Sequence, residues 1–213
     1  MNRSSSKAKE LLATAPVIPV ITIERAADAV PLARALIKGG LRVIEITLRT
    51  EAAMAAAAAI VAEVPEAIVG IGTVLTTQDL AQAGKAGAAF AISPGYTPEL
   101  LKAAAEGELP YVPGIQTASE LTSCITAGFE MVKFFPAVPA GGLPALNALS
   151  GPFPGVTYCP TGGIGAANAA EWLAHPKVIA VGGSWIAPPA DIKQGAWAAI
   201  EERARAASQL RKA

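Results

Sequence analysis

One lysine lies inside a short run of apolar and aromatic residues, where a charged amine is costly to bury. The residues around Lys133 are Val132, Phe134, Phe135 and Pro136. A buried amine needs a partner or must lose its proton. A neutral lysine amine is a nucleophile that forms a Schiff base with a ketone. The competing interpretation is a lysine at an exposed edge, or one whose head reaches water. Lys133 alone leaves both interpretations open.

A second run carries polar residues at every other position. Residues 43–48 are predicted to form a strand, so Glu45, Thr47 and Arg49 share one face, and the other face is aliphatic. In an open sheet, the polar face could be solvated, with an attraction between Glu45 and Arg49. In a closed parallel barrel, this face points inward, and residues near the carboxyl ends of the strands form the active site. Glu45 and Lys133 are then expected to meet inside the barrel.

Two glycine-rich turns follow the last two predicted strands. Residues 160–165 contain Thr161, Gly162 and Gly163, and residues 182–184 end at Ser184. Glycine lets bare backbone N–H groups face an anion, and a helix N-terminus strengthens such a site. Barrels commonly bind phosphate in the loops after strands seven and eight. The paired turns therefore predict a phosphate site.

The elements that must position these residues alternate along the chain. A short helix is predicted over 7–13. Eight strands are predicted over 17–21, 43–48, 68–73, 90–92, 111–113, 130–136, 156–159 and 178–181. Helices are predicted to follow them over 24–37, 50–63, 77–86, 98–105, 118–127, 143–149, 166–173 and 192–210.

Eight strand-then-helix units predict an α/β fold, a (β/α)8 TIM barrel with a short N-terminal helix. The alternative is an open doubly wound sheet, which would place a Gly-rich dinucleotide turn after its first strand, and Thr22-Ile23-Glu24 is not one. No linker or repeat divides residues 1–213, so we expect one domain.

Composition narrows the function classes. Of the 213 residues, 52% are hydrophobic and 16% are charged, which excludes a disordered chain. Seventeen basic residues balance seventeen acidic ones, so no nucleic-acid or membrane partner is expected. Cys124 and Cys159 are far apart, and the polar N-terminus lacks a signal peptide's apolar core, so a cytoplasmic protein is expected. His175 is the single histidine, which argues against a His-based metal site.

Several short motifs together resemble those of the 2-keto-3-deoxy-6-phosphogluconate (KDPG) aldolases. They are residues 43–50, 72–74, 92–95, 133–137, 160–164 and 182–185, within a resemblance that runs from about residue 8 to the end. The resemblance implies a class I aldolase with a (β/α)8 barrel, usually a homotrimer, that needs no metal and no cofactor. Its substrate would be a small phosphorylated keto acid, cleaved to pyruvate and glyceraldehyde 3-phosphate. Activity on 4-hydroxy-2-oxoglutarate is also expected.

Matched to these motifs, Lys133 would be the Schiff-base lysine and Glu45 the general acid/base. Arg49 and Thr73 would hold the substrate carboxylate. The other substrate-binding residues implied by the resemblance are Pro94, Phe135, Thr161, Gly162, Gly163 and Ser184. Some relatives that act on the galactonate epimer carry an arginine at the end of the first strand, where this chain has Thr22. That difference favours the gluconate substrate.

Other functions stay open at this point. A 2-dehydro-3-deoxy-6-phosphogalactonate aldolase is the nearest alternative. A metal-dependent aldolase would want histidine and carboxylate ligands. A non-catalytic phosphosugar-binding barrel would not need Lys133 to face Glu45. A barrel isomerase would bind phosphate but use a different acid/base pair.

Overall fold

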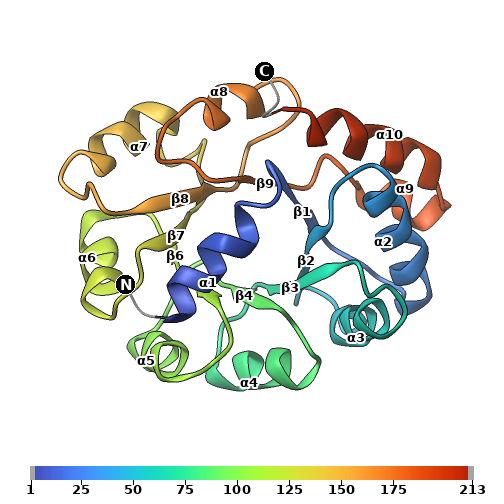
Figure 1. The fold of residues 1–213 in the computed structure, drawn as a ribbon, viewed down its shortest axis with the longest axis horizontal. Helices are drawn as coiled ribbons and strands as arrows, with labels where there is room; N and C mark the ends of the chain where they lie inside the picture. Colours follow the sequence, from blue (N-terminus) through green and yellow to red (C-terminus); the bar gives the residue numbers. More distant parts are fainter. Residues whose placement is uncertain (1–2, 211–213) are drawn as a thin grey trace.

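A ring of parallel strands surrounded by helices forms the centre of the computed structural model, which describes residues 3–210 (Figure 1). The strands are β1 (Val17–Ile21), β2 (Val43–Thr47), β3 (Ile68–Gly72), β4 (Phe90–Ile92), β5 (Tyr111–Val112), β6 (Gly114–Ile115), β7 (Met131–Phe134), β8 (Thr157–Pro160) and β9 (Val181–Gly183). Apolar and β-branched residues dominate most of these segments, as expected of strands covered on both faces.

The ring consists of two hydrogen-bonded sheets. One has the order β5-β4-β3-β2-β1-β9, and the other has the order β6-β7-β8. Isolated parallel bridges close the ring: Tyr158 of β8 pairs with Val178, just before β9, and Thr161, just after β8, pairs with Gly182 of β9. Pro113, which has no N–H, separates β5 from β6, so one barrel strand pairs with β4 by its first half and with β7 by its second half. The predicted (β/α)8 barrel is confirmed, and the open sheet is wrong.

Helices follow the strands and cover the outside of the barrel. They are α2 (Ala29–Lys38), α3 (Ala53–Glu63), α4 (Thr77–Lys85), α5 (Pro98–Glu106), α6 (Ala118–Thr126), α7 (Gly142–Ser150), α8 (Ala169–Leu173), α9 (Pro189–Gln194) and α10 (Trp197–Ser208). Capping boxes at Thr76 with Asp79 and at Thr117 with Glu120 fix where α4 and α6 begin. Between residues 3 and 210, no helix combines the length and hydropathy needed to span a bilayer.

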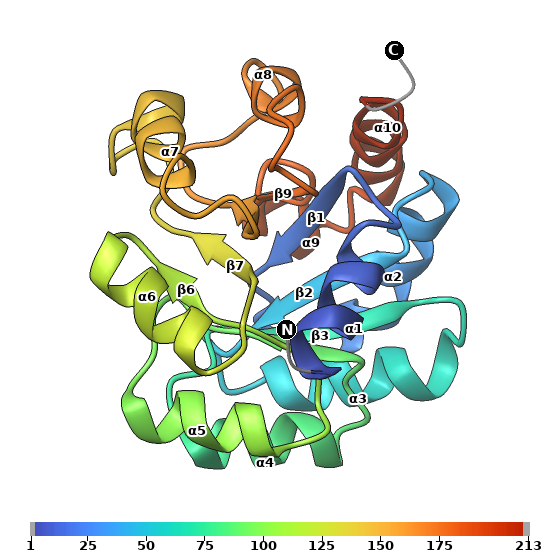
Figure 2. The same cartoon turned by 60° about the vertical axis from the view of Figure 1, so that its left-hand side comes forward.

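The first helix, α1 (Arg3–Leu12), lies across one end of the barrel (Figures 1 and 2). The Ser4 hydroxyl accepts a hydrogen bond from the N–H of Tyr111 and donates to the carbonyl of Leu109. The Ser5 hydroxyl accepts from the N–H groups of Glu130 and Met131. These partners lie where β5 and β7 begin. Helix α1 therefore closes the N-terminal end of the barrel and leaves the other end to the functional loops.

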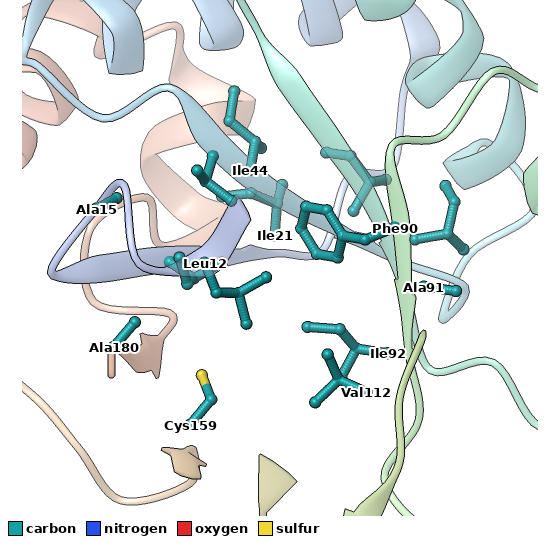
Figure 3. Packing of buried hydrophobic residues seen from close by; sticks show 14 of the residues in the cluster. Leu12, Ala15, Ile21, Ile44, Phe90, Ala91, Ile92, Val112, Cys159 and Ala180 are labelled. Carbon is teal, nitrogen blue, oxygen red and sulfur yellow. The ribbon is translucent and has the colours of Figure 1, made fainter. Parts of the chain in front are cut away.

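The hydrophobic core is built from residues of every barrel strand together with the inner faces of the helices. Figure 3 shows part of it, where Leu12, Ile21, Phe90 and Val112 are fully buried. Tyr111 and Phe129 meet edge to face, with ring centroids 5.7 Å apart. The core fixes the backbone of the strands, and with it the positions of the side chains that point into the barrel.

Several predicted boundaries differ from the structure. The last strand is Val181–Gly183 rather than residues 178–181, with Val178 making only an isolated bridge. The closing helix is two helices, because Gly195 ends α9 in a left-handed conformation, at φ 67°. The helix predicted over 166–173 begins only at Ala169. Residues 26–28 form a 3-10 turn before α2.

Candidate active site

Lys133 and Glu45 meet inside the barrel. Lys133 lies on β7 and Glu45 on β2, two strands that are not neighbours in the ring. The Nζ of Lys133 is 3.3 Å from Oε1 of Glu45, and the two side chains are 4% and 2% exposed. The attraction between the ammonium and the carboxylate therefore offsets part of the free-energy cost of burying the two charges. The interpretation of Lys133 as an exposed edge residue is wrong.

The surroundings of Lys133 come from both adjacent strands. Its Cα pairs in register with Gly114 on β6 and with Cys159 on β8, so these residues share the inward face. Its N–H donates to the carbonyl of Pro113 at 2.9 Å. The amine lies 5.4 Å from the centroid of the Phe135 ring, a cation–π distance. The lysine is thus held in a narrow, mostly apolar setting.

The polar face predicted for the second strand is inward. Thr47 is fully buried, and its hydroxyl donates to the carbonyl of Ile21 at 2.7 Å and lies 3.3 Å from the Thr22 hydroxyl. Arg49 lies beyond the strand end and is exposed. The partner of Glu45 is therefore Lys133, while Arg49 is left at the mouth of the barrel.

Thr73 follows β3 with an unusual backbone conformation. Its φ is 60°, in the left-handed region that a β-branched residue rarely adopts. Such conformations cost on the order of 1–3 kcal/mol and concentrate at functional sites. Pro94 is half-buried and lies two residues after the end of β4. Both residues lie at the carboxyl end of the barrel, as predicted.

The two glycine-rich turns lie side by side. Gly162 and Gly163 have φ values of 103° and 77°, so both need the left-handed conformation that glycine adopts freely. The carbonyl of Gly162 accepts from the N–H of Val138 at 2.9 Å, which ties this turn to the loop after β7. Thr161 is bridged to Gly182 in the next strand, and its buried hydroxyl lacks a hydrogen-bond partner among the described residues. Ser184 is exposed just after β9.

The helices that follow the two turns are short. Helix α8 has five residues and begins six residues after Gly163, and α9 has six. Because the effect of a helix N-terminus falls off within the first turn, the start of α8 lies too far along the chain to support an anion at Gly163 in the way the sequence suggested. Any anion at these turns would be bound by the backbone N–H groups of the turns and by Ser184.

The sequence did not predict the polar pair behind the site. The hydroxyls of Ser93 and Tyr111 are 2.6 Å apart, both fully buried, and the N–H of Gly114 donates to Ser93 at 3.3 Å. Burial raises the pKa of Tyr111 above its usual value, so the phenol stays protonated and can donate. The pair ties β4 to the strand beside Lys133. The sequence did contain one signal for this pair. Tyr111 lies in an apolar strand, and a buried tyrosine hydroxyl needs a hydrogen-bond partner.

Within residues 3–210, no group of three His, Cys, Asp or Glu side chains is arranged to hold a metal ion. Cys124 and Cys159 are both buried, and they are not joined in a disulfide. Burial raises the pKa of Cys124 to about 12, so this thiol is protonated at neutral pH.

Comparison with known proteins identifies the family. Residues 8–203 match the family model for KDPG and KHG aldolases, where KHG is 4-hydroxy-2-oxoglutarate. The chain is 51% identical over 207 residues to a KHG/KDPG aldolase from Escherichia coli strain K12, covering 97% of each protein. The chain belongs to the KDPG and KHG aldolase family. The predicted enzyme class, a carbon–carbon lyase, is thereby confirmed.

Two solved structures resemble this aldolase in fold. The KDPG aldolase from Legionella pneumophila is 47% identical with a TM-score of 0.93, and the match covers 94% of this chain and 98% of that one. That structure holds pyruvate captured at low pH as a covalent carbinolamine intermediate. The Zymomonas mobilis ZM4 enzyme, solved with 3-phosphoglycerate, is 42% identical with a TM-score of 0.92, and the match covers 97% of each chain.

Proposed function

We propose that this aldolase cleaves KDPG to pyruvate and glyceraldehyde 3-phosphate through a Schiff base on Lys133, with Glu45 moving the protons. The observation that carries the proposal is the buried contact between Lys133 Nζ and Glu45 Oε1, at 3.3 Å. A lysine nucleophile beside a positioned acid/base is the arrangement that a class I aldolase needs. The family membership and the carbinolamine in the Legionella enzyme support it.

Bond formation begins at the substrate ketone. Glu45 is placed to take a proton from the Lys133 ammonium, and the neutral amine that results attacks C2 with its lone pair. The resulting carbinolamine loses its hydroxyl as water once that oxygen has been protonated. The product is a protonated imine, whose positive nitrogen can accept the electron pair of the C3–C4 bond.

Cleavage then needs a base. The Glu45 carboxylate takes the proton of the C4 hydroxyl, the C3–C4 electrons move to the imine, and glyceraldehyde 3-phosphate leaves. The enamine that remains is protonated at C3, by Glu45 in its acid form or through one water. Water then attacks the imine carbon and releases pyruvate from Lys133. Glu45 thus returns to its starting state.

The remaining residues are proposed to bind the two ends of the substrate. Arg49 and Thr73, at the ends of neighbouring strands, would hold the carboxylate, with the arginine suited to a bidentate pair. The phosphate would lie at the turns that carry Gly162, Gly163 and Ser184. Pro94, Phe135 and Thr161 would form the walls between them.

We propose that the residue at the end of β1 helps to select between the gluconate and galactonate epimers of the substrate. Thr22 stands there and shares a 3.3 Å contact with Thr47. A neutral, short side chain at this place fits the gluconate epimer, and we propose 4-hydroxy-2-oxoglutarate as a second substrate, in keeping with the name of the Escherichia coli relative. The test is pyruvate release, coupled to lactate dehydrogenase, from KDPG, from its galactonate epimer and from 4-hydroxy-2-oxoglutarate. We expect kcat/KM to be highest for KDPG, and a preference for the galactonate epimer would contradict the assignment.

We also propose that residues 1–213 form one domain that assembles as a homotrimer in the cytoplasm. Two large apolar side chains, Leu75 and Val138, are 54% and 41% exposed in loops at the carboxyl end of the barrel. Two buried cysteines that are not joined in a disulfide suit a reducing compartment. Light scattering coupled to size exclusion tests the trimer, since a monomeric mass at micromolar concentration would contradict it.

A further inference from the structure

Gly72 occupies an inward position on β3 that does not need glycine for its backbone. It is buried, pairs in register with the inward-facing Thr47, and is not among the glycines with positive φ. In a strand of ordinary conformation, glycine is less favourable than alanine. A close approach of another group is the usual reason for keeping a glycine in such a place.

The group that approaches Gly72 is the carboxylate of Glu45. A Cβ at Gly72 would lie 2.1 Å from Oε1, 2.6 Å from Cγ and 2.7 Å from Cδ of Glu45. Non-bonded carbon and oxygen atoms do not approach so closely, since their optimal separation is about 3.5–4.0 Å. A side chain at position 72 and the observed conformation of Glu45 therefore exclude each other.

The atom that would be displaced is the one that contacts Lys133. Oε1 of Glu45 is 3.3 Å from Lys133 Nζ, and the same Oε1 is nearest to the missing Cβ. Because the three clashing atoms are the flexible end of a side chain, a change of Glu45 rotamer is the least costly relief. That change would move the carboxylate away from Lys133 and leave the backbone in place.

We propose that Gly72 is a positioning residue for the aldol cleavage, since its missing side chain provides the space in which the Glu45 carboxylate lies beside Lys133. The proposal rests on the proposed function of Glu45. Gly72 touches neither substrate nor product in this role and acts only through Glu45.

Gly70 provides a matched control on the same strand face. It lies two residues before Gly72 and pairs in register with Glu45 and Phe90. The three atoms that a Cβ at Gly70 would approach most closely all belong to the Phe90 ring, at 2.1–2.5 Å. Gly70→Ala should therefore disturb packing in the barrel mainly by displacing Phe90.

The first experiment separates imine formation from proton transfer in Gly72→Ala. Imine formation is measured as pyruvate trapped on the enzyme by borohydride. Proton transfer is measured as exchange of the pyruvate methyl protons with D2O, which requires a base to form the enamine. We expect trapping within a fewfold of wild type and exchange reduced at least roughly tenfold, which is less than the roughly 10²–10⁴-fold contribution of a correctly placed acid/base. Gly70→Ala should lower Tm and leave the ratio of exchange to trapping unchanged.

The second experiment asks whether Glu45 is the group displaced. Glu45→Ala removes Oε1, Cγ and Cδ, the three atoms nearest to the added methyl group. In a double-mutant cycle, Gly72→Ala should therefore reduce exchange at least fivefold less in the Glu45→Ala background than in wild type. If Gly72→Ala alone does not fold and the double variant does, the conflict with Glu45 is again supported. If neither folds, the glycine serves packing and the proposal is overturned.

The outcomes distinguish the role of Gly72 from the proposed role of Glu45 as the acid/base. Wild-type exchange in Gly72→Ala, with exchange lost in Glu45→Gln, overturns the role of Gly72 alone. The role of Gly72 is also overturned if the effects of the two substitutions on exchange multiply in the cycle. The same holds if Gly70→Ala changes the ratio of exchange to trapping as much as Gly72→Ala does. Unchanged exchange in Glu45→Gln overturns the role of Glu45 and the proposal with it.

Discussion

Nζ of Lys133 lies 3.3 Å from Oε1 of Glu45, although the two residues come from β7 and β2 on different parts of the barrel wall. Both side chains are almost completely buried, at 4% and 2% exposed. An ion pair this deep rarely adds net stability, because the desolvation of two charges offsets their attraction. Its presence in the barrel is better explained by chemistry than by folding.

Removal of one charge should therefore destabilise the fold more than removal of both. Lys133→Met leaves the Glu45 carboxylate buried without its ion-pair partner, and we expect a loss of about 3–5 kcal/mol in the free energy of unfolding. Lys133→Met combined with Glu45→Gln should recover much of this loss. Urea denaturation measures both. A double variant less stable than the single one would show that the charges are not energetically coupled.

Glu45→Gln should still form the imine but cleave KDPG poorly. The amide keeps the shape of the side chain and loses the ability to accept a proton, so kcat should fall roughly a hundredfold or more. The control is Glu24→Gln, which removes an exposed carboxylate just after β1. Near wild-type turnover in Glu45→Gln would mean that another group moves the protons.

The phosphate site is tested best at Gly163. Gly163→Ala forces a side chain into a turn with φ 77° and brings its Cβ to 2.6 Å from the Val138 Cβ, so the turn must shift. Loss of a hydrogen bond to a charged phosphate is worth about 1.5–3 kcal/mol, roughly tenfold or more in kcat/KM. The unphosphorylated substrate should be much less affected. Gly165→Ala is the control, because nothing lies within 4 Å of its Cβ.

The ratio of kcat/KM for KDPG to that for 4-hydroxy-2-oxoglutarate reports this site directly. We expect Gly163→Ala to lower the ratio and Gly165→Ala to leave it unchanged. A ratio that is the same in both variants and in wild type would place the phosphate elsewhere.

His175 gives a pH probe of the fold outside the site. Its Nδ1 accepts from the N–H of Lys177 at 3.1 Å, and Nε2 lies 2.9 Å from Oδ1 of Asn147, which suits the neutral ring. Burial and the charge of Lys177 lower the pKa of His175 below 6.5. The unfolded chain then binds the proton more readily, so stability is complete above pH 6.5 and falls as the pH drops through the folded pKa.

As the single histidine, His175 can be followed by NMR without assignment of other rings. We expect a titration midpoint below that of the unfolded chain. Lys177→Gln, which removes the nearby charge, should raise it. A midpoint at or above 6.5 would contradict the hydrogen-bond arrangement around the ring.

The residues that follow alternation or motif rules were predictable from sequence. Glu45 and Lys133 were placed on inward strand faces because side-chain direction alternates with a period of two. Gly162 and Gly163 were placed in an anion-binding turn because glycine leaves the backbone N–H groups bare. The barrel followed from the repeated alternation of strand and helix.

Features set by contacts distant in the sequence were not predictable. Pro113 divides one barrel strand into β5 and β6, and this division depends on β5 pairing with β4 and β6 pairing with β7. The pairing of Ser93 with Tyr111 and the role of Gly72 beside Glu45 depend on distances between strands, which no local pattern contains. The 3-10 turn and the start of α8 depend on tertiary packing, which overrides helix propensity.

The most direct test of Schiff-base formation at Lys133 is borohydride reduction of the enzyme in the presence of pyruvate, followed by peptide mass spectrometry. We expect one reduced pyruvyl group per chain on the peptide that contains Lys133, and none in Lys133→Met. Label on a different lysine, or no label in an active enzyme, would contradict the assignment of Lys133 as the Schiff-base residue.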